Sequence, residues 1–101
     1  MEKFNRIEKY TTHWHDQFNK EPYFQTRYQW SDYDPAYRYA WDQRQSNPNS
    51  QFSDMENSLE SGWEKVKGKS KLAWQDAKQA VRSGWHSIEH VLPGDADRDG
   101  R

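Results

Sequence analysis

Residues 72–94 read "LAWQDAKQAVRSGWHSIEHVLPG" and carry the clearest structural pattern in the chain. Their apolar side chains recur every three or four residues, which is the period of one face of an α-helix. These side chains are Leu72, Trp74, Ala77, Val81, Trp85, Ile88 and Leu92. Pro93 and Gly94 end the pattern, because proline has no N–H to continue a helix. The stretch predicts a long amphipathic helix with Trp74, Val81 and Trp85 in the core.

A first helix is predicted near the beginning of the sequence. Its apolar face has the same period and ends before Pro22; the residues of that face are Phe4, Ile7, Tyr10, Trp14 and Phe18. Residues 21–34 are aromatic and polar without a period, and they predict an ordered connection that lies on the core.

Asp34 and Pro35 predict the start of a second helix. Aspartate accepts free N–H groups there, and proline loses no hydrogen bond at the first helical position. The segment "QSNPNS", residues 45–50, closes this helix.

Ser53 and Glu56 form a capping box, S-x-x-E, and predict the start of a third helix. Gly68 ends that helix, and Ser70 is the candidate cap of the last one. The apolar stripe of the third helix is Met55, Leu59, Trp63 and Val66.

The composition supports a folded domain although aliphatic side chains are few. Ile, Leu, Val and Phe make up 12 of 101 residues, which is low enough to suggest disorder. Six Trp and six Tyr offset this, because each large aromatic side chain can bury about 150–250 Å². We predict one all-α domain over residues 1–93, a small bundle of about four helices with a Trp/Tyr-rich core, and a flexible acidic C-terminal tail over residues 94–101.

Large aromatic residues recur at intervals of eleven, at Trp30, Trp41, Phe52, Trp63, Trp74 and Trp85. Eleven residues make close to three helical turns, so a continuous repeat would predict a long right-handed helical assembly. Because Pro35, Pro48 and Gly68 interrupt such a helix, we favour separate helices that place their aromatic residues in one core.

Several classes of protein are disfavoured by the sequence. Cysteine is absent, which excludes disulfides and thiol chemistry. No signal peptide or apolar run long enough to cross a bilayer is recognisable, so we predict a cytoplasmic protein without membrane contact. No Gly-rich phosphate loop or catalytic triad stands out, and we predict neither an enzyme nor a cofactor.

The tail "GDADRDGR" resembles the beginning of an EF-hand calcium loop. Asp95, Asp97, Asp99 and Gly100 match its positions 1, 3, 5 and 6. The bidentate glutamate at position 12 is missing, so a solvated acidic tail is favoured over a weak calcium site.

The segment "HSIEH" carries His86 and His90 with the spacing of an inverted zinc-protease signature. A structural metal site would need a third ligand such as His13 or His15. Surface histidines are the favoured interpretation.

The stretch "KVKGKSK" is the main cluster of basic residues. Together with two basic residues further on, it is a candidate nucleic-acid-binding surface; its members are Lys65, Lys67, Lys69, Lys71, Lys78 and Arg82. Because the net charge is -1 and acidic residues lie nearby, a solvated junction is the alternative.

Two further segments carry a family resemblance. "YDPAYRYAWD", residues 33–42, contains Y-x-P-A-Y-R-Y, and residues 74–85 contain W-x-x-x-K-x-A-V-R-x-x-W. In these motifs the chain resembles small uncharacterised bacterial proteins that are often stress-associated. Ala40 stands where that family usually has glycine. The resemblance implies a stress-linked context and no catalytic residues.

We therefore expect a non-enzymatic, stress-associated structural or interaction protein that acts through exposed aromatic and charged side chains. Its partner would be a macromolecule or a second copy of the chain, because aromatic residues beyond what the core can hide would form an interface. The alternatives are a nucleic-acid-binding module and a largely disordered, hydrated protectant.

Overall fold

The structure is a computed structural model that describes residues 6–89. Within that range it contains four α-helices, one short 3-10 helix and no strand. The elements are α1 (Ile7–Gln17), η1 (Phe18–Lys20), α2 (Trp30–Ser46), α3 (Phe52–Val66) and α4 (Trp74–Glu89). The prediction of an all-α domain with about four helices is confirmed.

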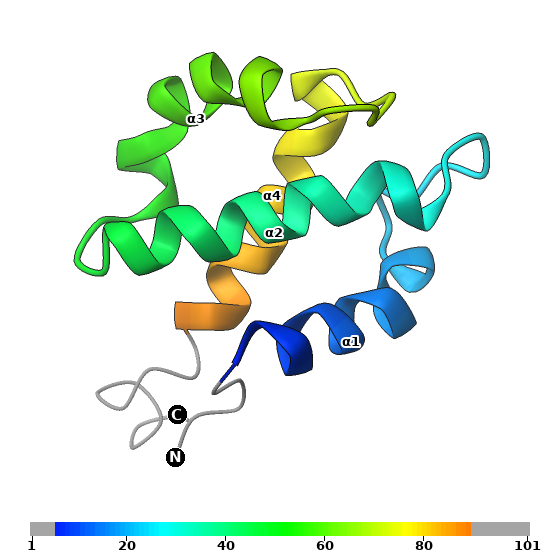
Figure 1. Ribbon diagram of the computed structural model, residues 1–101, viewed down its shortest axis with the longest axis horizontal. Coiled ribbons are helices and arrows are strands. Elements are labelled where there is room, and N and C mark those ends of the chain that lie inside the picture. Colours follow the sequence, from blue (N-terminus) through cyan, green and yellow to red (C-terminus); the bar gives the residue numbers. More distant parts are fainter. Residues whose placement is uncertain (1–5, 90–101) are drawn as a thin grey trace.

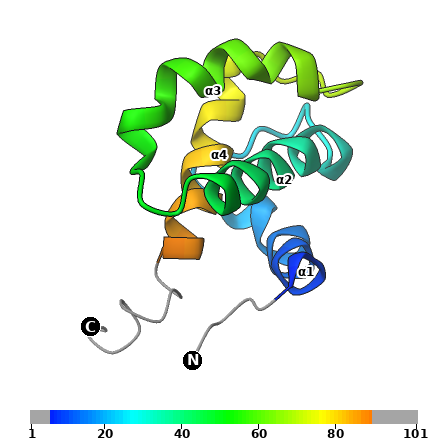
Figure 2. The ribbon, with the colours of Figure 1, turned by 60° about the vertical axis from the view of Figure 1, so that its left-hand side comes forward.

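α2 is the central helix of the bundle. It packs mainly on α4, which lies behind it in Figure 1, while α3 lies on one side of this pair and α1 on the other. The turned view in Figure 2 keeps α3 and α1 on opposite sides of α2. α3 also packs on α4, so α4 contacts both of the longest neighbouring helices.

The core is aromatic, as predicted. Trp85 and Val81 are fully buried and Trp74 is 9% exposed, so the prediction for these three residues is confirmed. The largest fully buried side chains are Trp63, Trp85, Tyr10, Tyr33, Tyr37, Leu59, Leu72 and Val81. Because aliphatic residues are few, a small number of large aromatic rings provides most of the buried apolar area.

α2 begins at Trp30, and the predicted start at Asp34 and Pro35 is wrong. The Asp32 carboxylate accepts the Gln29 backbone N–H at 3.0 Å, an arrangement that starts the helix earlier. Pro35 therefore lies inside the helix. Its missing N–H would have bonded to the carbonyl oxygen of Ser31, and Ser31 is an exposed residue.

The predicted capping box of Ser53 and Glu56 is also wrong. α3 begins one residue after Gln51, whose backbone N–H is accepted by the Asp54 carboxylate at 3.2 Å. Gly68 does follow the end of α3, as predicted. Its φ of 58° is in the left-handed region, which glycine adopts without strain.

Ser70 does not cap α4, contrary to the prediction. Its hydroxyl donates to the Asp32 carbonyl oxygen at 2.6 Å and accepts the Leu72 N–H at 3.2 Å. The Asp32 carboxylate also accepts the Lys71 N–H at 3.1 Å. These bonds tie the connection 67–73 to the first turn of α2, and α4 begins only after it.

The eleven-residue spacing places two aromatic residues in each of α2, α3 and α4. The first residues of the three helices are Trp30, Phe52 and Trp74, and eleven residues further along come Trp41, Trp63 and Trp85. Connections separate the three helices, so the expectation of separate helices is confirmed within the described range. The spacing therefore reflects a unit of 22 residues, one helix with its connection.

The motif "SGW" occurs once in α3 and once in α4, and both copies serve close packing. In each copy the tryptophan is fully buried and the glycine faces a tyrosine hydroxyl of another helix. Tyr39 approaches Gly62, and Tyr10 approaches Gly84. A Cβ atom on either glycine would overlap that hydroxyl, so the absence of a side chain is a condition of the packing.

Gly84→Ala is expected to lower the free energy of unfolding by about 1–3 kcal/mol, which is typical of overpacking. In an unconstrained helix the same change would stabilise by up to ~1 kcal/mol. Here the new Cβ would overlap the Tyr10 hydroxyl and lie 3.1 Å from the Ala40 Cβ. Urea unfolding measures the loss. Adding Tyr10→Phe should restore part of it, and a single variant more stable than the native chain would contradict the packing.

Three tyrosines form a hydrogen-bonded chain through the core. The Tyr10 hydroxyl donates to the Tyr37 carbonyl oxygen at 2.6 Å, and the hydroxyls of Tyr37 and Tyr23 are 2.5 Å apart. Burial raises the pKa of Tyr10 and of Tyr37 well above the usual 10.0, and it raises the pKa of Tyr23 to about 12. The neutral hydroxyls are the form that this environment stabilises.

Candidate interaction surface

The solvent-facing side of α4 carries three basic side chains. Lys78, Arg82 and His86 are spaced by four residues, so they share one face of the helix. Ala77 and Val81 on the opposite face are fully buried, so the three basic side chains face the solvent. Lys78 is half-buried, whereas Arg82 and His86 are exposed. We call Lys78, Arg82 and His86 the basic row.

A surface groove of about 380 Å³ lies between the basic row and the beginning of α3. Its α3 side is formed by Gln51, Phe52, Ser53 and Glu56. The Phe52 ring is 6% exposed and packs edge-on against a core tryptophan, so it gives the groove an apolar floor. The polar side chains around it are available to orient a bound segment. We call this depression the α3–α4 groove.

Arg82 is the cation of the basic row that is best placed to contact a partner. Within residues 6–89, no carboxylate oxygen lies within 4.0 Å of its guanidinium group. Lys78, by contrast, pairs with Glu56 at 2.5 Å. Lys78 and Arg82 also border a second depression of about 300 Å³ with Gln75 and Gln79. Arg82 therefore stands on a ridge between two depressions.

The six basic residues predicted as one nucleic-acid surface do not gather in one depression. Lys78 and Arg82 border the α3–α4 groove. Lys67 and Lys69 instead line a depression of about 400 Å³ between α2 and the end of α3. That depression contains Val66, which is 49% exposed and is the one exposed large hydrophobic residue in the described part of the chain.

Lys65 and Lys71 are exposed and border neither of these depressions. Lys67 is engaged by Glu64, with the ammonium nitrogen 3.5 Å from a carboxylate oxygen. The depression around Lys67 also holds Asp34 and Asp42, so its charges are mixed. The α3–α4 groove holds Lys78 and Arg82 with one carboxylate, Glu56, so the two depressions carry the same formal charge when His86 is neutral.

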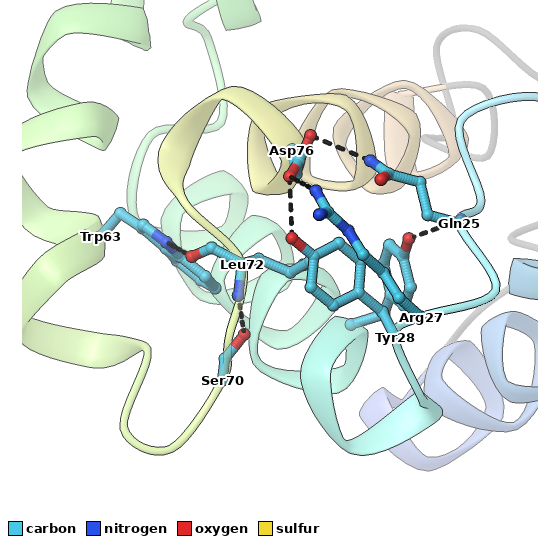
Figure 3. Close-up of polar contacts among 8 residues, drawn as sticks. Gln25, Arg27, Tyr28, Trp63, Ser70, Leu72 and Asp76 are labelled. Carbon is cyan, nitrogen blue, oxygen red and sulfur yellow. Dashed lines mark hydrogen bonds and ion pairs between the residues drawn. The ribbon is translucent and has the colours of Figure 1, made fainter.

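Asp76 gathers the polar contacts that hold the connection between α1 and α2 (Figure 3). Its carboxylate accepts the Gln25 side-chain amide and the Tyr28 hydroxyl, each at 3.1 Å, and the Arg27 guanidinium lies 3.8 Å away. On the other side of the connection 67–73, the Trp63 indole N–H donates to a carbonyl oxygen at 3.0 Å. These groups are satisfied within the fold, and we assign them a structural role.

The predicted metal ligands fall in separate settings. Asp95, Asp97 and Asp99 of the calcium prediction and His90 of the zinc prediction lie outside the described residues. His86 borders the α3–α4 groove. Among residues 6–89, no three His, Cys, Asp or Glu side chains are arranged to hold a metal ion.

The sequence did not predict that His86 and Glu56 share a site with Lys78 and Arg82. For His86 the signal was present, because the spacing of four residues continues from Lys78 through Arg82. For Glu56 it was not, since this residue is 22 positions from Lys78. Only the packing of α3 on α4 brings their side chains together.

Some aromatic side chains of the described range are partly exposed; they are Phe18, Tyr23, Phe24, Tyr28, Trp30 and Trp41. Every Trp, Tyr and Phe between residues 6 and 89 is at least partly buried. The surface of this range therefore offers a partner charged side chains together with the exposed parts of a few aromatic rings. In the same range, no helix combines the length and apolar character needed to span a membrane.

Comparison of the chain with protein-family models, curated proteins and solved structures gives no match.

Proposed function

We propose that this chain is a non-enzymatic interaction protein whose charged surface binds an anionic partner in the α3–α4 groove. The observation that carries the proposal is Arg82, an exposed cation without a carboxylate partner in the described range, on a ridge between two depressions. The net charge of the chain is -1, so the basic row is a local feature that a partner would recognise by position.

The shape of the groove favours a short acidic segment of a protein as the partner. Phe52 offers an apolar contact at the floor, while Gln51 and Ser53 add polar groups beside Arg82. A side-chain carboxylate can accept two hydrogen bonds from one guanidinium group. A stress-linked role depends on the family resemblance alone and stays a prediction. A homodimer through exposed aromatic rings has less support, because the rings are at least partly buried.

Nucleic acid is the second candidate partner. Four of the six predicted basic residues have no carboxylate within 4.0 Å in the described range; they are Lys65, Lys69, Lys71 and Arg82. Such side chains can neutralise phosphates, and the binding would weaken steeply with salt. A nucleic acid would have to contact several separate places on the surface rather than one depression.

Arg82→Gln is expected to weaken binding of a fluorescently labelled glutamate-rich peptide about tenfold, equal to ~1.4 kcal/mol. The reason is the loss of a charge-assisted hydrogen bond, which is typically worth ~1.5–3 kcal/mol. Fluorescence anisotropy at low salt measures the dissociation constant. Lys20→Gln on η1 is the control, since it removes the same charge from an exposed position outside the groove.

Equal weakening by Arg82→Gln and Lys20→Gln would contradict a specific site, and absence of binding at low salt would contradict the proposal. A single-stranded oligonucleotide serves as the second probe. Binding of the oligonucleotide alone, weakened by Lys69→Gln and Lys71→Gln as much as by Arg82→Gln, would favour the nucleic-acid module instead.

A further inference from the structure

The depression between α2 and the end of α3 combines an apolar centre with side chains of both charges. Val66, the last residue of α3, is 49% exposed, and Pro35 of α2 also lines the depression. The depression has a volume of about 400 Å³ and shares no lining residue with the α3–α4 groove. We call it the α2–α3 depression. Covering the exposed part of Val66 would remove apolar surface from water, which favours association with a partner.

Asp42 and Lys69 are the charged side chains of the α2–α3 depression that have no ion-pair partner within residues 6–89. The other charged side chains of the depression are engaged: Arg38 pairs with Asp34 at 2.9 Å, and Lys67 has the α3 partner described above. Asp42 and Lys69 are both exposed. One carboxylate and one ammonium group are therefore available to a partner on the same surface.

Lys69, Val66 and Asp42 follow one another along the direction of α2. The bond from the Ser70 hydroxyl to the Asp32 carbonyl oxygen holds the connection 67–73, and with it Lys69, beside the first turn of α2. Asp42 is ten residues beyond Asp32, which is about 15 Å along the helix axis. In Figure 1 the last turn of α3 lies above the middle of α2, between these two levels. The apolar centre is thus flanked by a cation at one end and an anion at the other.

This order of charges is complementary to itself. A two-fold axis through Val66 brings Asp42 of each copy to Lys69 of the other, so both pairs form together. The two separations match, because they are the same separation in two identical chains. The net charge of -1 leaves little repulsion between copies. A different partner would have to present an anion, an apolar group and a cation in the matching order.

We propose that the α2–α3 depression is the contact surface of a two-fold homodimer, with Val66 at its centre and two Asp42–Lys69 pairs at its edges. This interface goes beyond the proposed function and leaves the α3–α4 groove of both copies open. A single depression makes a small contact compared with stable dimers, which bury about 800 Å² on each partner. The dimer is therefore expected to be weak and to form as the protein concentration rises.

The test exchanges the charges one at a time in the full chain. Asp42→Lys and Lys69→Asp should each weaken dimerisation at least about tenfold, because each places two pairs of like charges in the interface. An equimolar mixture of these two variants should associate about as well as the native chain, since every pair then joins opposite charges. Sedimentation equilibrium at low salt, up to about 1 mM protein, measures the dissociation constants.

The control variants are Asp16→Lys and Lys20→Asp, which make the same charge changes at exposed positions outside the depression. They should leave the dissociation constant unchanged, alone or mixed. A native chain that stays monomeric up to about 1 mM would overturn the proposal. A mixture of Asp42→Lys and Lys69→Asp that stays dissociated would do the same, and so would assemblies that grow beyond the dimer, because a two-fold contact closes on itself.

Val66→Ser tests the apolar centre without changing the charge. It should weaken dimerisation about tenfold, because two valine side chains lose their contact. Since Val66 is half-exposed, the variant should keep the helical circular dichroism spectrum of the native chain. In NMR spectra of the native chain, signals that shift with protein concentration should belong to residues 34–43 and 66–69. A dimer that is insensitive to Val66→Ser, or shifts confined to other residues, would assign the contact to another surface and overturn the proposal.

Discussion

Trp85→Ala is expected to lower the free energy of unfolding by about 3–5 kcal/mol. The Trp85 side chain is fully buried, its ring packs edge-on against Phe52 at 6.3 Å, and the Arg44 cation lies over its face. Truncation would leave a cavity where α2, α3 and α4 meet. It would also remove the aromatic face that lies against the buried Arg44 cation. Since domains of this kind are typically stable by ~5–15 kcal/mol, the loss is a large share of the total.

Urea unfolding monitored by circular dichroism measures this loss. Trp41→Ala is the matched control, because Trp41 occupies the corresponding position of α2 but is only half-buried, and it should cost less. A loss below about 1 kcal/mol for Trp85→Ala would mean that α4 packs differently from the structure described here. If the variant does not fold, Trp85→Phe provides a milder change in the same direction.

The second large effect is a loss of stability above pH 10. The pKa values of Tyr10 and Tyr37 are raised in the folded chain, chiefly by burial. The unfolded chain therefore releases these protons at lower pH than the folded chain. Their contribution is fully present below pH ~10 and is lost as the pH rises toward the folded pKa values. Each of these two tyrosines lowers the free energy of unfolding by about 1.4 kcal/mol per pH unit, so together they lower it by about 3 kcal/mol per pH unit.

Unfolding free energies at neutral pH and at steps above pH 10 measure the slope, and ultraviolet absorbance shows whether phenolate appears together with unfolding. Tyr10→Phe should reduce the slope by about 1.4 kcal/mol per pH unit, because one buried ionisable group is gone. A constant unfolding free energy through pH ~11 would contradict the hydrogen-bonded tyrosine chain, and so would ionisation of Tyr10 or Tyr37 in a chain that stays folded.

Helical periodicity was enough to predict the fold class and the buried face of α4. The stripe through Trp74, Val81 and Trp85 needed no knowledge of its neighbours, because one helix face had to be covered. Helix starts were harder to predict. The sequence signals for a helix start were stronger at Asp34 and Ser53. The helices begin instead after Gln29 and Gln51, whose N–H groups bond to Asp32 and Asp54, because the surrounding packing decided which cap was used.

The candidate surface was predicted only in part. Lys78 and Arg82 were identified from their spacing, but the neighbouring lysines at the α3–α4 connection point to other parts of the surface. The groove itself depends on how α3 lies against α4, which no local pattern encodes. Helical spacing puts Arg44 on the same face of α2 as Ala36 and Tyr37, but an arginine near a helix end is ordinarily exposed, and only the tertiary structure shows it to be buried.

The two glycines of the "SGW" motifs also determine how far each helix can slide along its neighbour. A shift of α4 by one turn would bring Ala80 or Ile88 to the place of Gly84, and their Cβ atoms would meet the Tyr10 hydroxyl. Gly62 restricts α3 against Tyr39 in the same way. An aromatic ring can pack against many apolar neighbours, but a tyrosine hydroxyl can come this close to α3 or α4 only at a glycine. Gly62 and Gly84 therefore fix one axial register, much as one polar residue sets the register of a coiled coil. The glycines thus select a single arrangement for a core that hydrophobicity alone would leave free to slip.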